Sequence, residues 1–339
     1  MIIYTQLGCA TPNAKEELTS LPLQIRTMDT CQAMFGMNDQ NIRVLEDELR
    51  VTIHMHNGQL VAHGDAANVH MAEDILDKLQ NLLERGEQVD IGRMRYYVRL
   101  AQAGQLEQAE EIINDTVAYT YRGRPVRCKT GGQKAYVDAI RNNQLTIAVG
   151  PAGTGKTFLA IALAVAAYRN KMVERLVLTR PAVEAGEKLG FLPGDMAQKV
   201  DPYLRPLYDA LHEMMGTDGV QTMFDMGAIE IAPLAFMRGR TLNDAFIILD
   251  EAQNTTPEQM KMFLTRMGRN AKCVVTGDMT QIDLPPQRRS GLWMAQEVLS
   301  GIPGVQVMEL DKYDVVRNDL VQRIVAAYEA YENGESHNE

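Results

Sequence analysis

Residues 150–157 carry the most constraining feature of the chain, the glycine-rich sequence GPAGTGKT. It fits the pattern G-x-x-x-x-G-K-[ST], whose glycines let the backbone wrap closely around a phosphate group. The apolar run Leu145 to Val149 precedes it and is typical of a buried parallel strand. The alanine-rich run Phe158 to Tyr168 follows it and predicts a helix packed on a sheet. Strand, loop and helix together predict an α/β domain that binds a nucleotide.

The loop assigns a role to each of its members. The predicted phosphate-binding residues are Gly150, Pro151, Ala152, Gly153, Thr154, Gly155, Lys156 and Thr157. Backbone N–H groups and the start of the helix supply positive potential there. We expect Lys156 to reach the β- and γ-phosphates, and the Thr157 hydroxyl to hold Mg²⁺. The loop alone does not distinguish hydrolysis of the phosphate from its transfer or its sensing.

A second apolar run, Ile247 to Leu249, ends in the acids Asp250 and Glu251. A strand that delivers paired acids beside a phosphate loop predicts a metal site. We expect Asp250 to help hold Mg²⁺ and Glu251 to orient or deprotonate an attacking water, a role that hydrolysis needs. A helix start follows, with Thr256 as N-cap, Pro257 in the first turn and Gln259 closing a capping box.

A third apolar run, Ala271 to Thr276, leads into the sequence GDMTQ at 277–281. This order predicts that Gln281 lies at the carboxyl edge of the sheet, where open α/β folds bind ligands. Its amide is suited to sensing the γ-phosphate. With strand ends near Val177–Thr179 and Ile229–Ile231, we expect a parallel sheet of five or more strands. A small-molecule kinase is an alternative, but Glu251 and Gln281 favour attack by water.

Composition limits the class of protein. The chain has 339 residues, 45% of them hydrophobic and 23% charged, as in an ordinary soluble protein of about two domains. No apolar run reaches the length of a membrane helix and no secretory signal is evident. The four cysteines are scattered without a C-x-x-C pair, so we expect reduced thiols and a cytoplasmic protein. A net charge of −10 restricts any nucleic-acid contact to a local surface.

The N-terminal part predicts a second, smaller domain. Residues 1–30 show little periodicity, and no fold is predicted for them. Residues 31–90 then read as helix (38–49), strand (50–56), an Asn57-Gly58 turn, strand (59–63) and helix (67–83). An α-β-β-α unit of this size resembles a KH-like RNA-binding module.

Two features weaken RNA binding by this module. A KH domain clamps the backbone of RNA with a G-x-x-G loop, whereas Gly36 to Asp39 reads GMND, which lacks the second glycine and adds an acid. Residues 1–95 also hold 14 acidic against eight basic residues. RNA binding and a docking role therefore stay open as alternatives. The nearby His54, His56 and His63 suggest a metal site, but no carboxylate or cysteine completes a ligand set, and surface histidines are the preferred interpretation.

Residues 91–135 are predicted to be a helical connector that ends in a basic stretch. From Tyr119 to Lys134 the chain carries two tyrosines, five basic residues and no acid; the basic residues are Arg122, Arg124, Arg127, Lys129 and Lys134. Basic residues interleaved with aromatic ones can follow a single-stranded nucleic acid and stack on its bases. A solvated linker is the alternative.

The order of the three motifs adds a resemblance. A phosphate loop, then DEAQ at 250–253, then GDMTQ at 277–281 resembles the first RecA-like domain of superfamily 1 helicases. That likeness implies that Gln133, before the loop, reads the adenine base. More specifically, TRPAVEAGEKLGFLPG at 179–194 and FMRGRTLND at 236–244 resemble the PhoH-like protein family (the PhoH/YbeZ group) over about residues 120–331.

The family resemblance implies a cytosolic ATPase tied to RNA metabolism. It also implies a partner, a single-strand endoribonuclease of the YbeY type. Within the ATPase domain, Thr179, Arg180 and the stretch near Tyr121 are the expected nucleic-acid contacts.

Length suggests that the site is completed by another subunit. From Leu145 onward there is room for one RecA-like domain, whereas superfamily 1 helicases use arginines from a second such domain. An arginine supplied in trans, and hence a ring or other head-to-tail homo-oligomer, is expected. The candidates are Arg238, Arg240, Arg288, Arg289 and Arg317.

The sequence thus predicts an α/β RecA-like P-loop domain at 136–331 with a mainly parallel sheet, a small N-terminal α+β KH-like module, and a polar tail at 332–339. The leading hypothesis is Mg²⁺-dependent ATP hydrolysis coupled to handling or remodelling of RNA. The second is an ATP-gated adaptor that docks an endoribonuclease without unwinding strands.

Overall fold

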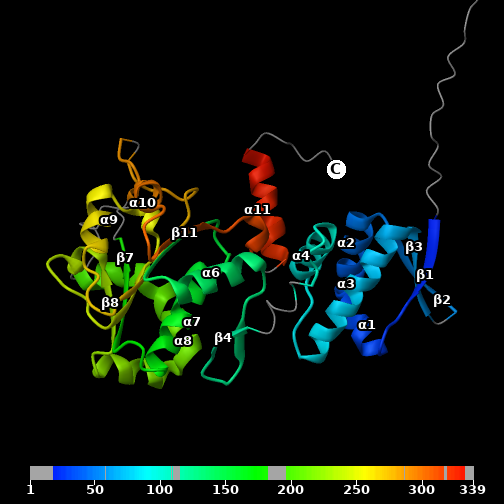
Figure 1. The fold of residues 1–339 in the computed structure, drawn as a ribbon, viewed down its shortest axis with the longest axis horizontal. Helices are drawn as coiled ribbons and strands as arrows, with labels where there is room; N and C mark the ends of the chain where they lie inside the picture. The colour runs from blue at the N-terminus through cyan, green and yellow to red at the C-terminus, as the bar shows by residue number, and fades with distance from the viewer. Residues whose placement is uncertain are drawn as a thin grey trace, which may run out of the picture. The chain divides into compact units, whose positions relative to one another are not determined.

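The computed structural model describes residues 18–57, 59–107, 109, 115–181, 196–285, 287–316 and 319–332. The chain divides into two compact units, with the boundary between Leu106 and Glu107 (Figure 1). Some predictions lie outside the described residues. They concern the first 17 residues, Gly58, the family-like segment from Ala182 to Gly194, Arg317 and most of the polar tail.

The larger unit is built on a six-stranded sheet. Its strands are β6 (Leu145–Val149), β7 (Arg175–Arg180), β8 (Ile229–Pro233), β9 (Ala245–Leu249), β10 (Lys272–Gly277) and β11 (Val305–Glu309). They lie in the order β11-β6-β10-β9-β7-β8, and every neighbouring pair is parallel. The prediction of an α/β fold with a mainly parallel sheet is confirmed. The edge strand β11 was not predicted, because its sequence VQVME alternates polar and apolar residues and lacks a continuous apolar run.

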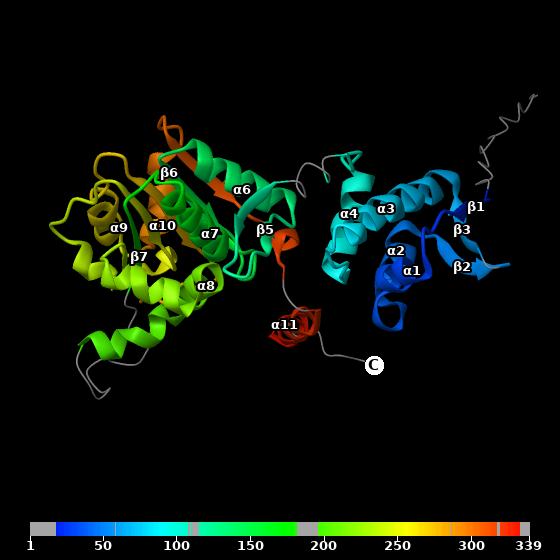
Figure 2. The same cartoon turned by 90° about the horizontal axis from the view of Figure 1, so that it is seen from below.

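Helices cover both faces of this sheet (Figures 1 and 2). The helices α6 (Gly131–Asn142), α7 (Lys156–Arg169) and α8 (Met196–Asp225) contact it on one side. On the other side lie α9 (Pro257–Leu264) and α10 (Gly291–Leu299), with the short helices η3 (Leu234–Met237) and η4 (Ala252–Asn254). A last helix, α11 (Asp319–Glu332), follows η5 (Lys312–Asp314). A small hairpin of β4 (Thr116–Tyr119) and β5 (Pro125–Arg127) packs on α7.

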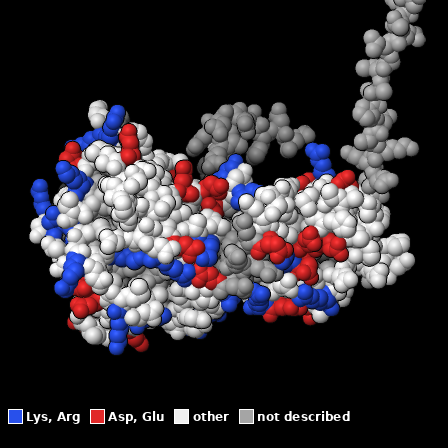
Figure 3. All heavy atoms as spheres, viewed as in Figure 1, with Lys and Arg blue, Asp and Glu red and all other residues white. Residues whose placement is uncertain are grey.

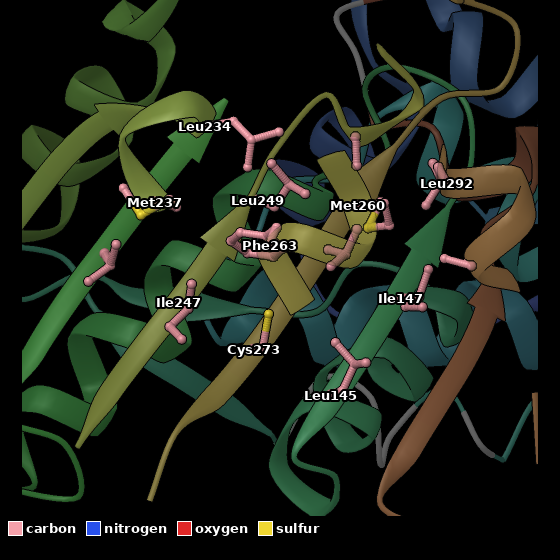
Figure 4. Packing of buried hydrophobic residues seen from close by; sticks show 14 of the residues in the cluster. Leu145, Ile147, Leu234, Met237, Ile247, Leu249, Met260, Phe263, Cys273 and Leu292 are labelled. Atoms are coloured by element: carbon pink, nitrogen blue, oxygen red, sulfur yellow. The ribbon is translucent and has the colours of Figure 1, made fainter. Parts of the chain in front are cut away.

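The core beneath α9 shows why the strands are continuous apolar runs. Leu145 and Ile147 of β6, Ile247 and Leu249 of β9 and Cys273 of β10 point toward the helix that carries Phe263 (Figure 4). Because helices cover both faces, residues on either side of each strand are buried, as all five residues of β6 and of β9 are. Helix α9 starts as predicted, with Thr256 as N-cap and the reciprocal capping box to Gln259.

The N-terminal unit is an antiparallel α+β module. It runs β1 (Leu18–Leu23), α1 (Met28–Phe35), η1 (Met37–Asp39), α2 (Gln40–Leu49), β2 (Thr52–His56), β3 (Gln59–Asp65), α3 (Ala66–Glu84) and α4 (Ile91–Gln102). The sheet order is β1-β3-β2. The two predicted helices and the two predicted strands are each present within a few residues of their expected bounds.

Three parts of this unit differ from the expectation. Residues 18–23, to which no fold was assigned, pair with β3, and α1 precedes the first predicted helix. Helix α4 contacts α2 and α3, so the start of the expected connector belongs to this unit. The Gly36 to Asp39 segment joins α1 to α2, with left-handed backbone at Gly36, Asn38 and Asp39. Periodicity missed β1 because residues 18–23 neither alternate cleanly nor form a continuous apolar run.

Within the described residues, no helix has the length and apolar character needed to cross a membrane.

Candidate nucleotide-binding site

The phosphate loop begins where β6 ends, at the carboxyl edge of the sheet. The N–H of Gly150 donates to the Gly277 carbonyl at 3.1 Å, which ties the loop to β10. A Cβ at Gly150 would lie 2.5 Å from the Leu310 carbonyl oxygen, so only glycine fits beside the chain leaving β11. Gly155 has a φ of +80° and precedes the first residue of α7, Lys156. The strands beside β6 therefore fix the start of the loop, and its end leads directly into α7.

The Lys156 ammonium lies inside the loop. Its Nζ donates to the carbonyl oxygens of Gly150 at 2.6 Å and Pro151 at 2.8 Å, and to Thr154 Oγ1 at 3.2 Å. The side chain is buried, and these oxygens satisfy its charge. Phosphate oxygens are stronger acceptors because they carry charge, so the geometry suits an exchange of loop oxygens for phosphate.

Asp250 is the first residue after β9, and its buried carboxylate is fully engaged. Its Oδ1 accepts from Thr157 Oγ1 at 2.7 Å and from Thr276 Oγ1 at 2.6 Å. Its Oδ2 accepts from Arg180 Nε at 2.8 Å and from a second guanidinium nitrogen of Arg180. The parallel register places Thr276 and Arg180 beside it, since β10 and β7 flank β9.

The donor atoms here fit a hard cation that keeps most of its ligands from water and phosphate. Thr157 Oγ1 and Asp250 Oδ1 lie side by side, and Mg²⁺ prefers such oxygen ligands, with one or two from protein and the rest from solvent and nucleotide. Among the described residues, no group of three or more His, Cys, Asp or Glu could hold a metal by itself. Thr157 and Asp250 are thus the residues that would hold Mg²⁺.

Glu251 projects toward the same space. It has a left-handed backbone, with φ of +54°, which turns the chain sharply after Asp250. Its side chain is 39% exposed. Its Oε2 accepts from Gln253 Nε2 at 2.7 Å, and its Oε1 lies 3.8 Å from Arg180 Nη2. A carboxylate held on one side and open on the other is suited to contact a water molecule.

Gln253 joins Glu251 to the segment that follows β10. The fully buried Gln253 accepts from the Asp278 N–H at 3.0 Å and donates to the Gln281 carbonyl at 3.1 Å. The Gln281 side chain donates to Asp278 Oδ2 at 3.0 Å. Glu251, Asp278 and the predicted sensor Gln281 therefore belong to one hydrogen-bonded network.

A pocket of about 270 Å³ brings most of the predicted residues together. Its lining includes Ala152, Gly153, Gly155, Lys156, Thr157, Phe158, Asp250, Glu251, Gly277, Asp278 and Gln281. Gly150, Pro151 and Thr154 do not line it; their oxygens face Lys156. The predicted site residues thus converge at one edge of the sheet.

Gln133 lies beside the loop, as the third residue of α6. Its Nε2 donates to the Thr154 carbonyl at 3.1 Å and its Oε1 accepts from the Lys129 N–H at 2.7 Å. Nearby, Tyr136 donates to the Lys156 carbonyl at 3.0 Å, and burial raises the pKa of this tyrosine, which keeps its hydroxyl protonated. In this structure Gln133 braces the phosphate loop; adenine reading stays a prediction.

Two expected nucleic-acid contacts on β7 point inward. Thr179 is completely buried, so it cannot touch a nucleic acid at the surface, and that expectation is wrong. Arg180 is only 14% exposed and binds Asp250. Strand β7 is covered by helices and neighbouring strands, which sequence alone did not show for its last two residues.

The basic stretch divides between the two ends of α7. Arg169, the last residue of α7, donates to the Tyr119 carbonyl at 2.9 Å, and Tyr121 packs against Gly216 of α8. The phosphate loop lies at the other end of α7, about 20 Å away at 1.5 Å per residue. Lys129 lies near the loop, bonded to Gln133. The exposed tyrosines of the hairpin are therefore remote from the nucleotide pocket.

The candidate arginines have different surroundings. Arg240 forms a bidentate pair with Glu230, and Arg289 lies over the Trp293 ring. Arg238 and Arg288 are exposed. Arg240 is therefore engaged within its own chain, while Arg238 and Arg288 project into solvent.

The histidines lie on the open face of the small sheet. His54 and His63 stack with centroids 5.1 Å apart, and His56 lies 6.4 Å from His54. His63 bonds to Ser20. All three side chains are exposed, as the preferred interpretation of surface histidines expects.

Three contributors to the site were not predicted. Thr276 and Gln253 contact the acids, and Arg180 was assigned another role. A signal for the first two was present, because both are polar residues at strand ends on the carboxyl edge of the predicted sheet. Nothing in the sequence directed Arg180 toward Asp250.

Comparison with known proteins agrees with the motifs. The profile of the family described as "PhoH-like protein" matches residues 125–329, and that of "IstB-like ATP binding protein" matches residues 58–184. The PhoH-like protein of Bacillus subtilis is 46% identical over 314 residues, which cover 93% of this chain and 98% of the relative. That of Mycobacterium tuberculosis is 50% identical, covering 90% of this chain and 86% of the relative.

A solved structure, the Sulfolobus solfataricus SWI2/SNF2 ATPase core in complex with dsDNA, is similar with a TM-score of 0.32 and 14% identity. It covers 54% of this chain and 43% of that one. The profile match spans more than half of the chain, and the relatives span nearly all of it. The chain therefore belongs to the PhoH-like protein family, as an ATP-binding P-loop protein.

Proposed function

We propose that the protein hydrolyses ATP in a Mg²⁺-dependent reaction and couples it to the handling or remodelling of RNA. The observation that carries the hydrolytic part is the position of Glu251. Its carboxylate lines the same pocket as Lys156, Thr157 and Asp250, and it is partly exposed. A protein that only bound nucleotide would not need a second acid there.

Each residue has a defined task in this reaction. Lys156 and the loop N–H groups bind the β- and γ-phosphates, replacing the present bonds of Lys156 to loop oxygens. Thr157 and Asp250 would hold Mg²⁺, which would supply positive charge to offset that of the phosphates. Glu251 accepts a proton from, or orients, the attacking water while Gln253 holds its other oxygen. Gln281, linked through Gln253, responds to loss of the γ-phosphate.

An arginine from a neighbouring subunit is the second part of the proposal. Among the described residues that line the pocket, Lys156 is the one cation. Stabilisation of the transition state by an arginine is worth up to about 10³–10⁵ in rate. Arg238 and Arg288 are exposed and suited to insert into an adjacent subunit. We therefore propose a head-to-tail homo-oligomer, such as a ring, in which one subunit completes the site of the next.

The exposed tyrosines Tyr119 and Tyr121, with Arg122 and Arg124 on the same hairpin, support a local contact with single-stranded RNA. The rest of the visible surface gives little support for a broad one. Lys and Arg side chains form only short streaks among acids on the face seen in Figure 3. An endoribonuclease of the YbeY type is the proposed protein partner. Three described cysteines, Cys31, Cys128 and Cys273, are free and buried, which agrees with a cytoplasmic location.

A second function, an ATP-gated adaptor that docks the nuclease without unwinding, is favoured by one specific observation. The basic hairpin lies at the far end of α7 from the phosphate loop, so a strand bound there would not cross the nucleotide edge of the sheet. In this reading nucleotide changes the shape of the protein, and RNA stays with the partner.

The test measures release of phosphate from ATP with and without single-stranded RNA. Lys156→Ala and Glu251→Gln are the site variants. Asp209→Asn is the matched control, because Asp209 is an exposed acid of α8 that does not line the pocket. We expect both site variants to lose turnover and the control to keep it; full turnover in both site variants would contradict the assignment.

Duplex unwinding and RNA stimulation separate the two functions. An RNA-remodelling ATPase shows stimulation by RNA, whereas an adaptor shows none and separates no strands. A protein that stays monomeric with nucleotide and still turns over ATP rapidly would contradict the arginine in trans.

A further inference from the structure

Arg180 makes contacts that differ in kind from the nucleic-acid contact expected from the sequence. It ends β7 and turns its guanidinium away from solvent. Two of its nitrogens bind Asp250 Oδ2, and Nη1 donates to the Tyr203 carbonyl of α8 at 2.9 Å. It lies 3.8 Å from Glu251 Oε1. Its charge is therefore directed at both acids of the site.

The two oxygens of Asp250 face different partners. Oδ1 meets the hydroxyls of Thr157 and Thr276, on the side of the phosphate loop. Oδ2 accepts two hydrogen bonds from the guanidinium of Arg180. A nearly buried carboxylate without a counter-charge is costly, and an unpaired one attracts any available cation. Arg180 satisfies that requirement in the absence of nucleotide.

From this arrangement we infer that Arg180 is a positioning residue that sets the metal affinity of Asp250. Its charge prevents free divalent cations from occupying the site alone, so that the cation enters together with the phosphates of ATP. The fork to Asp250 and Tyr203 also fixes the rotation of the carboxylate, leaving Oδ1 toward Thr157. This inference rests on the proposed hydrolysis only for its effect on turnover, not for its effect on metal binding.

The physical reason is the repulsion between two cations that share one anion. An arginine and a divalent ion on opposite oxygens of a carboxylate repel each other, and removing the arginine charge should tighten metal binding roughly tenfold. A residue with only a structural role would have the opposite effect, because its loss would disorder Asp250 and weaken the metal site.

The direct test uses Mn²⁺ alone, with nucleotide-free protein, and follows the electron paramagnetic resonance signal of the free ion. Arg180→Gln removes the charge, and Arg180→Met is a second charge-free variant that keeps the length of the side chain. Arg180→Lys keeps the charge. The matched control is Arg175→Gln, at the other end of β7, where Arg175 donates to the Asn243 carbonyl.

We expect both charge-free variants to bind Mn²⁺ about tenfold more tightly than the wild type. The lysine variant and Arg175→Gln should match the wild type. Adding Asp250→Asn to Arg180→Gln should remove the gain. Unchanged or weaker Mn²⁺ binding in the charge-free variants would overturn the inference.

A second measurement follows ATP turnover as free Mg²⁺ is raised above the ATP concentration. Excess Mg²⁺ should inhibit Arg180→Gln, because the ion then occupies Asp250 before the nucleotide arrives, and should leave the wild type unaffected. Equal profiles would contradict the inference. A wild type that hydrolyses no ATP would refute the proposed function instead, while the Mn²⁺ measurement would still decide the role of Arg180.

Discussion

The two units of the chain bury polar side chains for different purposes. In the N-terminal unit, the buried Asn41 donates to the Val89 carbonyl, and Gln80 joins the Arg26 N–H to the Gln24 carbonyl. These contacts connect neighbouring segments of backbone. In the larger unit, the buried Lys156 and Asp250 instead line one pocket, and the buried Gln253 donates a hydrogen bond to Glu251, which also lines it.

These two patterns of buried polar groups indicate which unit offers a site for a ligand. Buried polar groups that only join segments of backbone serve stability, whereas groups that converge on a cavity leave acceptors and donors for a ligand. The candidate ligand site of the protein therefore lies in the larger unit, which carries the phosphate loop. Any role of the N-terminal unit must use its exposed features, such as the Gly36 to Asp39 turn or the histidine-bearing sheet face.

The largest expected effect on turnover of ATP is that of substituting Glu251, in the pocket of the larger unit. Glu251→Gln should lower turnover of ATP at least about 100-fold, because an amide cannot accept the proton of the attacking water. Binding of ATP should stay within about threefold of wild type, since Lys156 and the loop are untouched. Turnover and equilibrium binding are measured on the same preparation. Loss of binding in parallel with turnover would show a structural role.

Leu79→Ala tests whether the buried core of the N-terminal unit contributes to stability alone. Leu79 is completely buried in α3, and its truncation should cost about 2–4 kcal/mol of stability in the N-terminal unit. Because Leu79 lies in the N-terminal unit and the nucleotide pocket in the other, turnover of ATP should remain within twofold of wild type. Urea unfolding monitored together with turnover checks both. A large loss of turnover under native conditions would break the division between the units.

Gly150→Ala probes the close approach behind the phosphate loop. The added Cβ would meet the Leu310 carbonyl oxygen at 2.5 Å, so the strand ends must move, at about 1–3 kcal/mol. Gly219→Ala is the control. Gly219 lies within α8, where a Cβ would make an ordinary contact at 3.5 Å, and alanine there should be neutral or stabilising. Equal stability of the two variants, measured by thermal unfolding, would contradict a clash between a Cβ at position 150 and the Leu310 carbonyl.

Gln133→Ala distinguishes adenine reading from bracing of the loop. Loss of its bond to the Thr154 carbonyl should weaken ATP binding about tenfold, equivalent to about 1.4 kcal/mol. If Gln133 also reads adenine, the loss will be larger for ATP than for GTP. The two nucleotides are compared by fluorescence titration. Equal losses would assign it to the loop alone.

The smallest expected effect is on stability, at Asp115 near the start of the larger unit. Arg141 donates to Asp115, with Lys134 also close, and these hydrogen bonds hold the pKa of Asp115 below its usual value. A lowered pKa means that this contribution is present above the unfolded pKa of about 3.9 and is lost as pH falls through the folded pKa. Asp115→Asn should therefore lower stability by about 1 kcal/mol at pH 7. The difference from wild type should shrink as pH falls below the unfolded pKa and disappear once pH is below the lowered folded pKa of Asp115; a constant difference in thermal unfolding across pH would contradict it.

The sequence predicted most of the site because its parts are local in the chain. GPAGTGKT at 150–157 contains its own strand end, turn and helix start, so Lys156 and Thr157 are placed by their neighbours. Asp250 and Glu251 follow an apolar run that can only be a buried strand in this context. In the N-terminal unit, two helices and a hairpin were predictable from their periodicity for the same reason, while β1 required pairing with β3, whose paired residues lie 37 to 47 positions away.

Tertiary structure decided what sits beside these local motifs. The strand order β10-β9-β7 places Thr276 on one oxygen of Asp250 and Arg180 on the other, although the three are far apart in sequence. It buries Thr179 and places the tyrosine hairpin at the far end of α7 from the phosphate loop. The local motifs of the sequence thus specified which groups line the nucleotide pocket. The fold alone determined their counter-charges and exposure, because both depend on strands that meet only after folding.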